Sequence, residues 1–152
     1  MENQAGERVR EILSRIGAAL DLQAAIEVNE TAEAVDARYV GDDVGVLISH
    51  HGSVIDAIQH LAYRIAFHGA EDRKLVSVDA GGYRERRATA LRSVGEQAAD
   101  AAIREQRPVA LDPMSALERK VVHEHLKSRH DVETYSEGQE PSRRLVVAPV
   151  IG

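Results

Sequence analysis

The chain has 152 residues, of which 43% are apolar and 29% charged, and its net charge is −6 at pH 7. That length fits one ordinary domain or two very small ones. The absence of cysteine excludes disulfides, thiolate zinc sites and cysteine nucleophiles, and it suits a reducing cytosol. The first residues are polar, and no stretch approaches the ~20 apolar residues of a membrane span. We therefore expect a soluble cytoplasmic protein with no signal peptide and no membrane insertion.

The distribution of charge bears on the kind of ligand. A negative net charge argues against a polyanion, because phosphate neutralisation dominates nucleic-acid affinity. Counting Asp, Glu, Lys and Arg, however, residues 1–80 sum to −7 and residues 81–152 to +1. Local patches decide binding more than net charge does, so the second half stays open as a nucleic-acid-binding region. Aromatic residues make up only 3% of the chain, so any base stacking must rely on tyrosine, histidine and arginine.

In the first half, the periodicity predicts the order helix, strand, strand, helix, helix, strand. Apolar residues at helical spacing predict a helix over 7–20, and alternation over 34–40 predicts a half-buried strand that pairs with 25–29. Asp42 or Asp43 is expected to cap a short helix that follows. A second helix is expected to bury one apolar face before a strand over 75–78. That face consists of Val54, Ile58, Leu61 and Ile65.

The second half begins at the Gly81-Gly82 break, and we place the boundary between two domains just before or at this pair. A long helix is predicted over 83–105, followed by a short strand over 109–111. Ser115 and Glu118 have the spacing of a capping box and open a helix that runs to about Lys127. A terminal strand pair is predicted over 132–137 and 143–150. The residues expected to face inward from the long helix are Leu91, Val94, Ala98 and Ala101.

The first candidate site is the break between the two helices of the first half, formed by Ser49, His50, His51 and Gly52. A tight turn at this point exposes backbone N–H groups at a helix N-terminus, which attracts phosphate. Gly52 has no Cβ, so a sugar-phosphate strand could approach it closely. An ordinary turn between two helices explains the same residues, and the motif alone does not decide between them.

The second candidate site lies on the helix that starts near Ser115. Residues four apart share one helix face, so Arg119 and His123 are expected to point the same way, beside Lys120 and Lys127. The opposite half of the helix, predicted to be buried, carries Leu117, Val121, Val122 and Leu126. An arginine next to an imidazole can hold one phosphate. The alternative is a solvated helix face with ordinary charge pairs.

Taken together, element order and motifs resemble the bacterial Jag family, the SpoIIIJ-associated, KhpB-type RNA-binding proteins. The similarity covers roughly residues 22–148. It rests on several segments in the correct order, which are GDDVGVLI at 41–48, the turn through Gly52, DAIQ at 56–59, GYRERR at 82–87, PMSALER at 113–119, and SEG…PSRR at 136–144. This resemblance implies an α+β protein that has a type II KH domain over 1–80 and a small R-3-H domain with a three-stranded sheet over 81–152.

The resemblance also implies a function. Both modules would bind single-stranded RNA, with single-stranded DNA as the alternative ligand, and the protein would act as a post-transcriptional regulator or RNA chaperone. In the KH domain, the turn Ser49–His50–His51–Gly52 would clamp the nucleic-acid backbone. In the R-3-H domain, the binding residues would be Arg119, Lys120, His123, Lys127, Arg143 and Arg144.

The KH turn departs from the family pattern in ways that suggest weaker binding. The pattern has glycine where this chain has Ser49, and basic residues where it has His50 and His51. Histidine gains its charge on the mildly acidic side of neutrality, so we expect the turn to bind more strongly as the pH falls. The chain also begins at the helix before the KH domain, so we expect it to lack the extra N-terminal domain of some relatives.

Two other functions are disfavoured by the sequence, and a third remains open. A metal site is disfavoured, because His123-Glu124-His125 lacks the histidine spacing of a zinc hydrolase and there is no cysteine. A hydrolytic enzyme is disfavoured, because no nucleophile elbow or P-loop is present. We therefore expect no catalysis, no cofactor and no metal. A protein-binding adaptor remains the main alternative, with a degenerate KH module that docks another KH-domain protein or a second copy.

Overall fold

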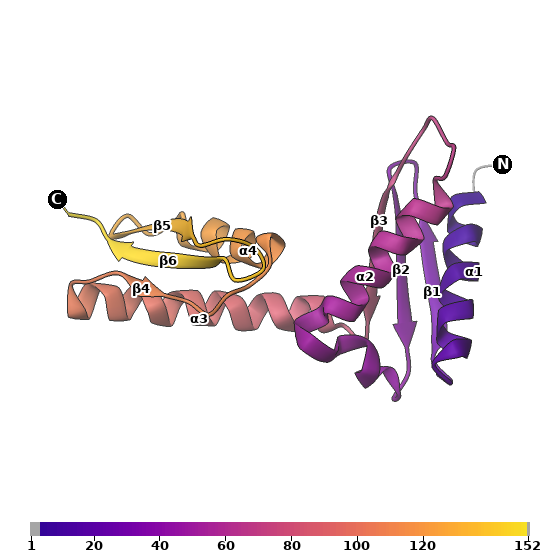
Figure 1. The fold of residues 1–152 in the computed structure, drawn as a ribbon, viewed down its shortest axis with the longest axis horizontal. Coiled ribbons are helices and arrows are strands. Elements are labelled where there is room, and N and C mark those ends of the chain that lie inside the picture. Colours follow the sequence, from indigo (N-terminus) through magenta and orange to yellow (C-terminus); the bar gives the residue numbers. More distant parts are fainter. Residues whose placement is uncertain (1–3, 152) are drawn as a thin grey trace. The chain divides into compact units, whose positions relative to one another are not determined.

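The structure is a computed structural model that describes residues 4–151. It consists of two compact units that divide between Arg84 and Glu85 (Figure 1). Helices and two three-stranded sheets build these units, which confirms the α+β class. The domain limits inferred from the sequence, 1–80 and 81–152, remain a prediction, and each unit is described by itself below.

The N-terminal unit is one layer of helices on one face of a sheet. Helix α1 (Gln4–Ala19) leads into the hairpin of β1 (Ala25–Glu30) and β2 (Ala34–Val40), and β3 (Leu75–Ala80) then pairs in parallel with β2. The strand order is β1-β2-β3. Alternation in β2 works as predicted, because Val35, Ala37 and Tyr39 are buried while the residues between them face solvent.

Two helical segments connect β2 to β3. A 3-10 helix, η1 (Val44–Ile48), is followed by α2 (Ser49–Ala66), which packs against β3 and α1. The Tyr39 hydroxyl lies beneath this layer and donates to the carbonyl oxygen of Leu13 at 2.7 Å. Burial raises the pKa of Tyr39 to about 12, so this phenol stays a hydrogen-bond donor at physiological pH.

Two details of this unit differ from the sequence-based expectation. Asp43 precedes η1 but does not cap it, because its carboxylate accepts the backbone N–H of Gln23 at 2.6 Å instead. On α2, Ile58 is buried as predicted, but Leu61 and Ile65 are 47% and 49% exposed. The buried face is rotated from the predicted one and includes two alanines, which let the helix lie close to its neighbours. The residues of this face are Ile55, Ile58, Ala62 and Ala66.

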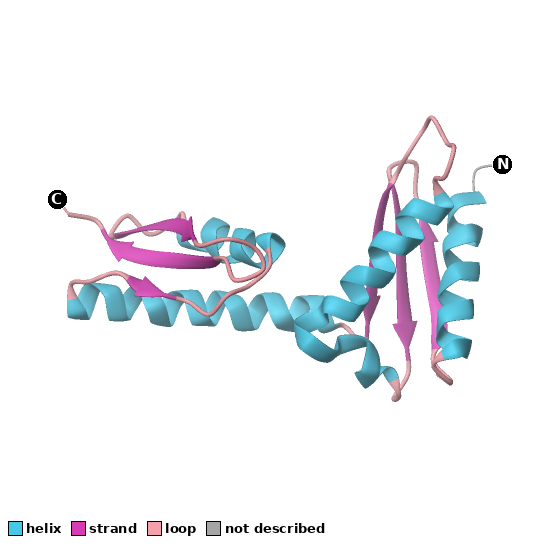
Figure 2. Cartoon of the chain, in the orientation of Figure 1, coloured by secondary structure: helices cyan, strands magenta, loops and turns pink. Residues whose placement is uncertain are grey.

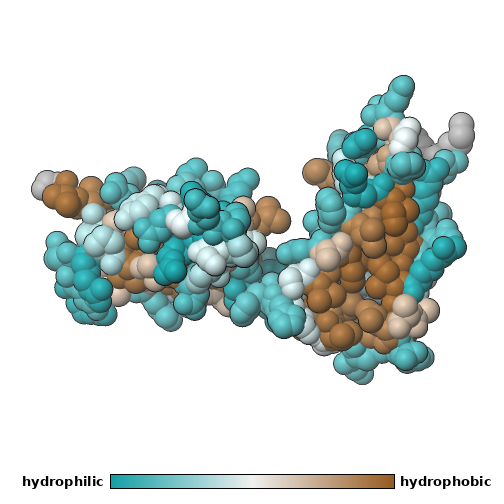
Figure 3. All heavy atoms as spheres, in the orientation of Figure 1, coloured by the Kyte–Doolittle hydropathy of each residue, from teal (hydrophilic) through white to brown (hydrophobic). Residues whose placement is uncertain are grey.

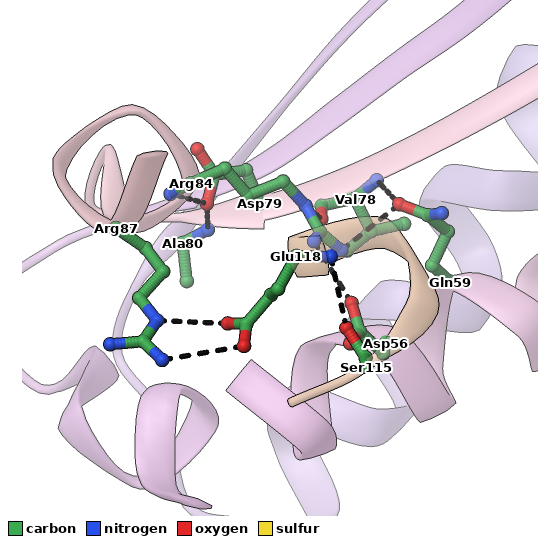
Figure 4. A network of polar contacts seen from close by, with 9 residues as sticks. All are labelled: Asp56, Gln59, Val78, Asp79, Ala80, Arg84, Arg87, Ser115 and Glu118. Atoms are coloured by element: carbon green, nitrogen blue, oxygen red, sulfur yellow. Dashed lines mark hydrogen bonds and ion pairs between the residues drawn. The ribbon is translucent and has the colours of Figure 1, made fainter. Parts of the chain in front are cut away.

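The end of the N-terminal unit fixes the start of helix α3 (Tyr83–Glu105). Gly81 and Gly82 both have positive φ angles, of 56° and 69°, so the predicted break after β3 is present. The Asp79 carboxylate accepts the backbone N–H of Arg84 at 3.2 Å. The Arg84 side chain in turn donates to Asp56 and Gln59 of α2, at 2.9 and 3.1 Å (Figure 4). The first turn of α3 is thereby tied to the N-terminal unit.

The C-terminal unit combines α3, beyond Arg84, with a small antiparallel sheet and one more helix. Strand β4 (Val109–Ala110) precedes α4 (Ala116–Leu126), and β5 (Val132–Glu137) and β6 (Arg144–Pro149) close the chain. The strand order is β4-β6-β5, so β5 is an edge strand (Figure 2). Ser115 caps α4 as predicted, with its hydroxyl oxygen 3.3 Å from the backbone nitrogen of Glu118.

The core of this unit joins both helices to β6. Gly95 of α3 lies so close to α4 that a Cβ added there would sit 2.8 Å from Cγ1 of Val122. Glu118 does not complete the capping box, because its carboxylate makes a two-pronged contact with Arg87 at 2.8 and 3.3 Å (Figure 4). The predicted inward faces are only partly correct, because Val94 and Leu117 are exposed.

Among residues 4–151, no helix is both long and apolar enough to cross a membrane.

Candidate nucleic-acid interface

The turn of the N-terminal unit has an unusual backbone. His50, His51 and Gly52 all have left-handed φ angles, of 55°, 56° and 85°. Such a conformation costs a residue with a side chain roughly 1–2 kcal/mol. Non-glycine residues persist in it only where the surroundings impose it, and such positions concentrate at binding sites. Both histidine side chains are exposed, so they stand at the tip of a constrained turn.

The substitution of glycine by Ser49 has no backbone cost. Ser49 has a φ of −64° and a ψ of 154°, an extended conformation that any residue adopts. Its hydroxyl is 3.3 Å from the carbonyl oxygen of Val46 and 3.4 Å from that of Gly45, at the end of η1. The serine therefore closes the preceding helix, and the fold does not need a glycine at this position.

Gly52, by contrast, is required by both its backbone and its neighbour. Besides its positive φ, a Cβ at this position would sit 2.7 Å from Cε1 of Tyr83. The tyrosine ring thus closes the inner side of the turn. The four predicted residues lie together in sequence and space, but whether they contact nucleic acid remains a prediction.

In the C-terminal unit, Arg119 is not on the exposed basic face predicted for α4. It is 8% exposed, and its guanidinium donates to the carbonyl oxygen of Met114 and to the Glu140 carboxylate, both at 2.7 Å. Met114 itself donates through its backbone N–H to the carbonyl oxygen of Arg143. Through these contacts Arg119 joins α4 to both neighbouring loops. A buried guanidinium is stable only when its donors are hydrogen-bonded and its charge is paired, and these contacts meet both needs.

Arg143 has a comparable bracing position in the loop between β5 and β6. Its guanidinium donates to the carbonyl oxygens of Gly138 at 2.6 Å and Ser136 at 3.4 Å. Gly138 has a φ of 90°, which opens the loop, and the N–H of Ser142 bonds to the carbonyl oxygen of Gln139 to close it. These three hydrogen bonds brace the loop.

His123 and Lys120 line a surface pocket of about 300 Å³ between α4 and the edge strand β5. The Nδ1 of His123 makes a short contact with the Thr134 hydroxyl, which fixes the imidazole plane. Lys120 is exposed and makes no hydrogen bond or ion pair within residues 4–151, and its charge interacts with the Glu124 carboxylate, one turn along α4, only over a longer distance. Ser136 adds a hydroxyl to the lining. The pocket therefore combines a cation, an oriented imidazole and hydroxyl groups, all of which can donate to a phosphate.

The remaining predicted cations lie elsewhere. Lys127 follows the C-terminal end of α4 and pairs with Glu124 at 3.1 Å, which lowers the pKa of Glu124. Arg144 is the cross-strand neighbour of Glu137, so strand alternation places it on the sheet face opposite to Leu145, a pocket-lining residue. The six predicted residues therefore divide into three groups. Lys120 and His123 share the pocket, Arg119 and Arg143 brace the loops (Arg119 also lines the pocket), and Lys127 and Arg144 lie apart.

Much of the other positive charge of the unit is neutralised. Arg129, just after α4, pairs with Glu96, Asp100 and Asp131 at 2.8 to 2.9 Å. The hydrogen bond to Arg129 holds the pKa of Asp131 below its usual value. This cluster ties the end of α4 to α3 and to β5, so its arginine has a structural part.

Three residues beside the predicted site were missed from the sequence. Thr134 orients His123, Glu140 pairs with Arg119, and Tyr135 lines the pocket. No local pattern marks Thr134 or Glu140, because their partners lie 11 and 21 positions away. Tyr135 could have been noticed, because it is the only Phe, Trp or Tyr in the sequence after residue 84.

Residues 89–149 match the R-3-H domain family, so the C-terminal unit is an R-3-H domain, the class named for the Arg119–His123 spacing. Proteins named RNA-binding protein KhpB are similar over more of the chain. The one from Clostridium symbiosum is 30% identical over 97% of this chain, and the one from Lactiplantibacillus plantarum is 42% identical over 68%. The Bacillus subtilis protein is 28% identical over 90%.

The chain belongs to the KhpB family, also called the Jag family. The resemblance found in the sequence motifs is thereby confirmed. The alignments cover 66% of the Clostridium symbiosum relative, 32% of the Lactiplantibacillus plantarum relative and 66% of the Bacillus subtilis relative. The chain thus spans between about a third and two thirds of the length of these proteins.

Proposed function

We propose that this chain binds single-stranded RNA through its R-3-H unit, at the pocket between α4 and β5. The observation that carries this proposal is the placement of Lys120 beside His123 and the Thr134 hydroxyl. An exposed lysine whose ammonium makes no ion pair in the described part of the chain, and interacts with the Glu124 carboxylate only over a longer distance, is available to neutralise a phosphate. An imidazole held in one orientation adds a directional donor. The relatives named above carry RNA binding in their names, which supports RNA as the ligand.

An unpaired strand suits this site better than a duplex. The pocket is small and open, and one cation and one imidazole match one phosphate group rather than the two backbones of a helix. Proteins that bind single-stranded RNA hold unstacked bases, which a duplex does not offer. We therefore expect modest affinity, with a shallow dependence on salt.

The test is a binding titration of the full chain with labelled single-stranded RNA, a duplex of the same sequence and the matching single-stranded DNA. Each titration is repeated at several salt concentrations. The proposal expects single strands to bind more tightly than the duplex, and affinity to fall as salt rises. Equal or tighter binding of the duplex, or no binding at low salt, would contradict it.

We further propose that the N-terminal unit is a type II KH module whose turn, Ser49 to Gly52, contacts the nucleic-acid backbone. The element order α1-β1-β2-η1-α2-β3 and the constrained left-handed turn support this. If the histidines hold a phosphate, the affinity for single strands should rise as the pH is lowered from about one unit above the ordinary histidine pKa to about one unit below it. The double variant His50→Gln/His51→Gln should lose that rise. An unchanged pH profile in the variant would exclude the turn from binding.

A second candidate function for the same unit is docking of a protein, either another KH-domain protein or a second copy. Exposure of Leu61 and Ile65 on α2 favours it. Figure 3 shows apolar atoms gathered on one face of the N-terminal unit. Sedimentation of the full chain and of the Leu61→Ser/Ile65→Ser variant would test self-association.

Whether this unit binds RNA or a protein, we propose that the chain acts in the cytoplasm as a post-transcriptional regulator without catalysis. Assays for RNA cleavage should therefore show no turnover.

A further inference from the structure

Tyr135 is the aromatic residue of the C-terminal unit, and its side chain remains accessible. It lies in the middle of β5, and the residue is 45% exposed. In the register of the sheet it faces Val146 of β6, a small neighbour that leaves the ring without an aromatic partner. Because burial of a tyrosine contributes strongly to packing, a half-exposed ring on an edge strand keeps much of its apolar face available.

Tyr135 lies beside the pocket, so a ligand bound in the pocket can also contact the tyrosine ring. Tyr135 lines the same pocket as Lys120 and His123. Its chain neighbours Thr134 and Ser136 point toward α4, while strand alternation sends the Tyr135 ring to the opposite face of the sheet. Since β5 is an edge strand, a ligand that enters the pocket can reach the ring across the open edge.

We propose that Tyr135 stacks an unpaired nucleobase across the edge of β5 while Lys120 and His123 hold the adjoining phosphate. This deepens the function proposed above and rests on it. It assigns the base-contacting residue of the R-3-H unit and explains why the site would select unpaired nucleotides. Every base has a π-face, so a single tyrosine gives a preference for single strands without a preference for sequence.

The charges around Tyr135 limit where the phosphate can lie. Glu133 and Glu137 flank Tyr135 at alternate positions of β5, so their carboxylates repel a phosphate on the outer face of the sheet. Arg144, the cross-strand neighbour of Glu137, offsets only one of them. The phosphate is therefore favoured on the pocket side of the strand, beside Lys120, and the uncharged base on the outer side.

The test uses the full chain and separates stacking from charge. Tyr135→Ile keeps a residue that favours strands but removes the ring, whereas Tyr135→Phe keeps the ring. We expect Tyr135→Ile to weaken single-strand RNA binding roughly 5- to 100-fold, with the salt dependence unchanged, because stacking releases no counterions. Tyr135→Phe should bind nearly as the unchanged protein does.

A fluorescence experiment reports contact between position 135 and the RNA directly. The chain has no tryptophan, so Tyr135→Trp introduces a single indole. Its fluorescence should be quenched by single-stranded RNA but not by duplex RNA. The control is Leu117→Trp, at a 64% exposed position on α4, which should show no quenching.

The outcomes distinguish this inference from the function on which it rests. If Tyr135→Ile binds single strands as tightly as the unchanged protein, or the indole at position 135 is not quenched, base stacking is wrong while RNA binding stands. If the unchanged protein binds no single-stranded RNA, both fall together.

Discussion

The guanidinium of Arg119 reaches Glu140 across 21 positions of the sequence, with Nη2 and Oε1 2.7 Å apart. The arginine is buried, whereas the glutamate lies on the exposed loop between β5 and β6. This pair fastens the loop to α4. Both residues of the R-3-H spacing line the pocket beside Lys120, but the guanidinium of Arg119 is already paired with the loop that precedes Arg144.

Replacement of Arg119 should therefore loosen the loop. Arg119→Ala removes the donors to Met114 and Glu140, and we expect a loss of about 2 kcal/mol in the stability of the C-terminal unit. Amide hydrogen exchange over residues 138–145 would measure it, with faster exchange expected there than in the N-terminal sheet. Glu140→Gln should produce a smaller effect of the same kind, and the double variant should add little to Arg119→Ala. Additive effects would mean that the two residues act independently.

Lys120 should govern the salt dependence of binding. Lys120→Gln removes a cation that has no ion-pair partner within residues 4–151, so stability should change by less than about 0.5 kcal/mol. If the lysine neutralises one phosphate, the slope of log affinity against log salt for single-stranded RNA should become shallower by about 0.7. The matched control is Lys127→Gln, whose cation already pairs with Glu124. A slope that falls equally in both variants would remove the pocket from consideration.

Local patterns were sufficient to predict most elements of this fold. The predicted spans of β2, α3 and β5 agree with the structure residue for residue, because alternation and helical periodicity are strong over those segments. Faces were predicted less well. Periodicity identifies which side of a helix is apolar, but the neighbours decide which side is covered. On α2 the sheet covers Ala62 and Ala66, and the larger Leu61 and Ile65 remain exposed.

The prediction of the site residues was limited in the same way, because the sequence does not show which residues are neighbours in the fold. A helical projection places Arg119 and His123 on one face, and both do approach the pocket. The projection cannot show that the guanidinium of Arg119 is already paired with Glu140 and hydrogen-bonded to the carbonyl oxygen of Met114. The predicted basic stripe is therefore wrong as a single surface. The sequence alone named candidate site residues but not the division between those that brace the loops and those that face outward.

Acid should weaken the C-terminal unit partly through Asp131. Its hydrogen bond to Arg129 lowers its pKa, so the folded state favours the carboxylate. A group with a depressed pKa contributes stability that is present above its unfolded pKa, near about 4, and is lost as the pH falls through the folded value. Asp131→Asn should therefore flatten the fall in stability below about pH 4. Urea midpoints measured across this range would show it, with Glu133→Gln as an exposed control on β5. An unchanged profile in Asp131→Asn would contradict the argument.

Gly52 offers a test of the constrained turn. Gly52→Ala places a Cβ 2.7 Å from the Tyr83 ring at a φ of 85°, so it incurs both a steric clash and the penalty of the left-handed conformation. Gly69→Ala is the matched control, because its φ of 74° carries the conformational penalty alone and no atom lies within 4 Å of the added Cβ. We expect Gly69→Ala to lower the free energy of unfolding by about 1 kcal/mol, and Gly52→Ala by about 2–4 kcal/mol. Urea denaturation of the full chain measures both changes. If the clash with Tyr83 is the cause, Tyr83→Ala should recover part of the loss in the double variant. Equal losses for the two alanine variants would mean that Tyr83 does not hold the turn in place.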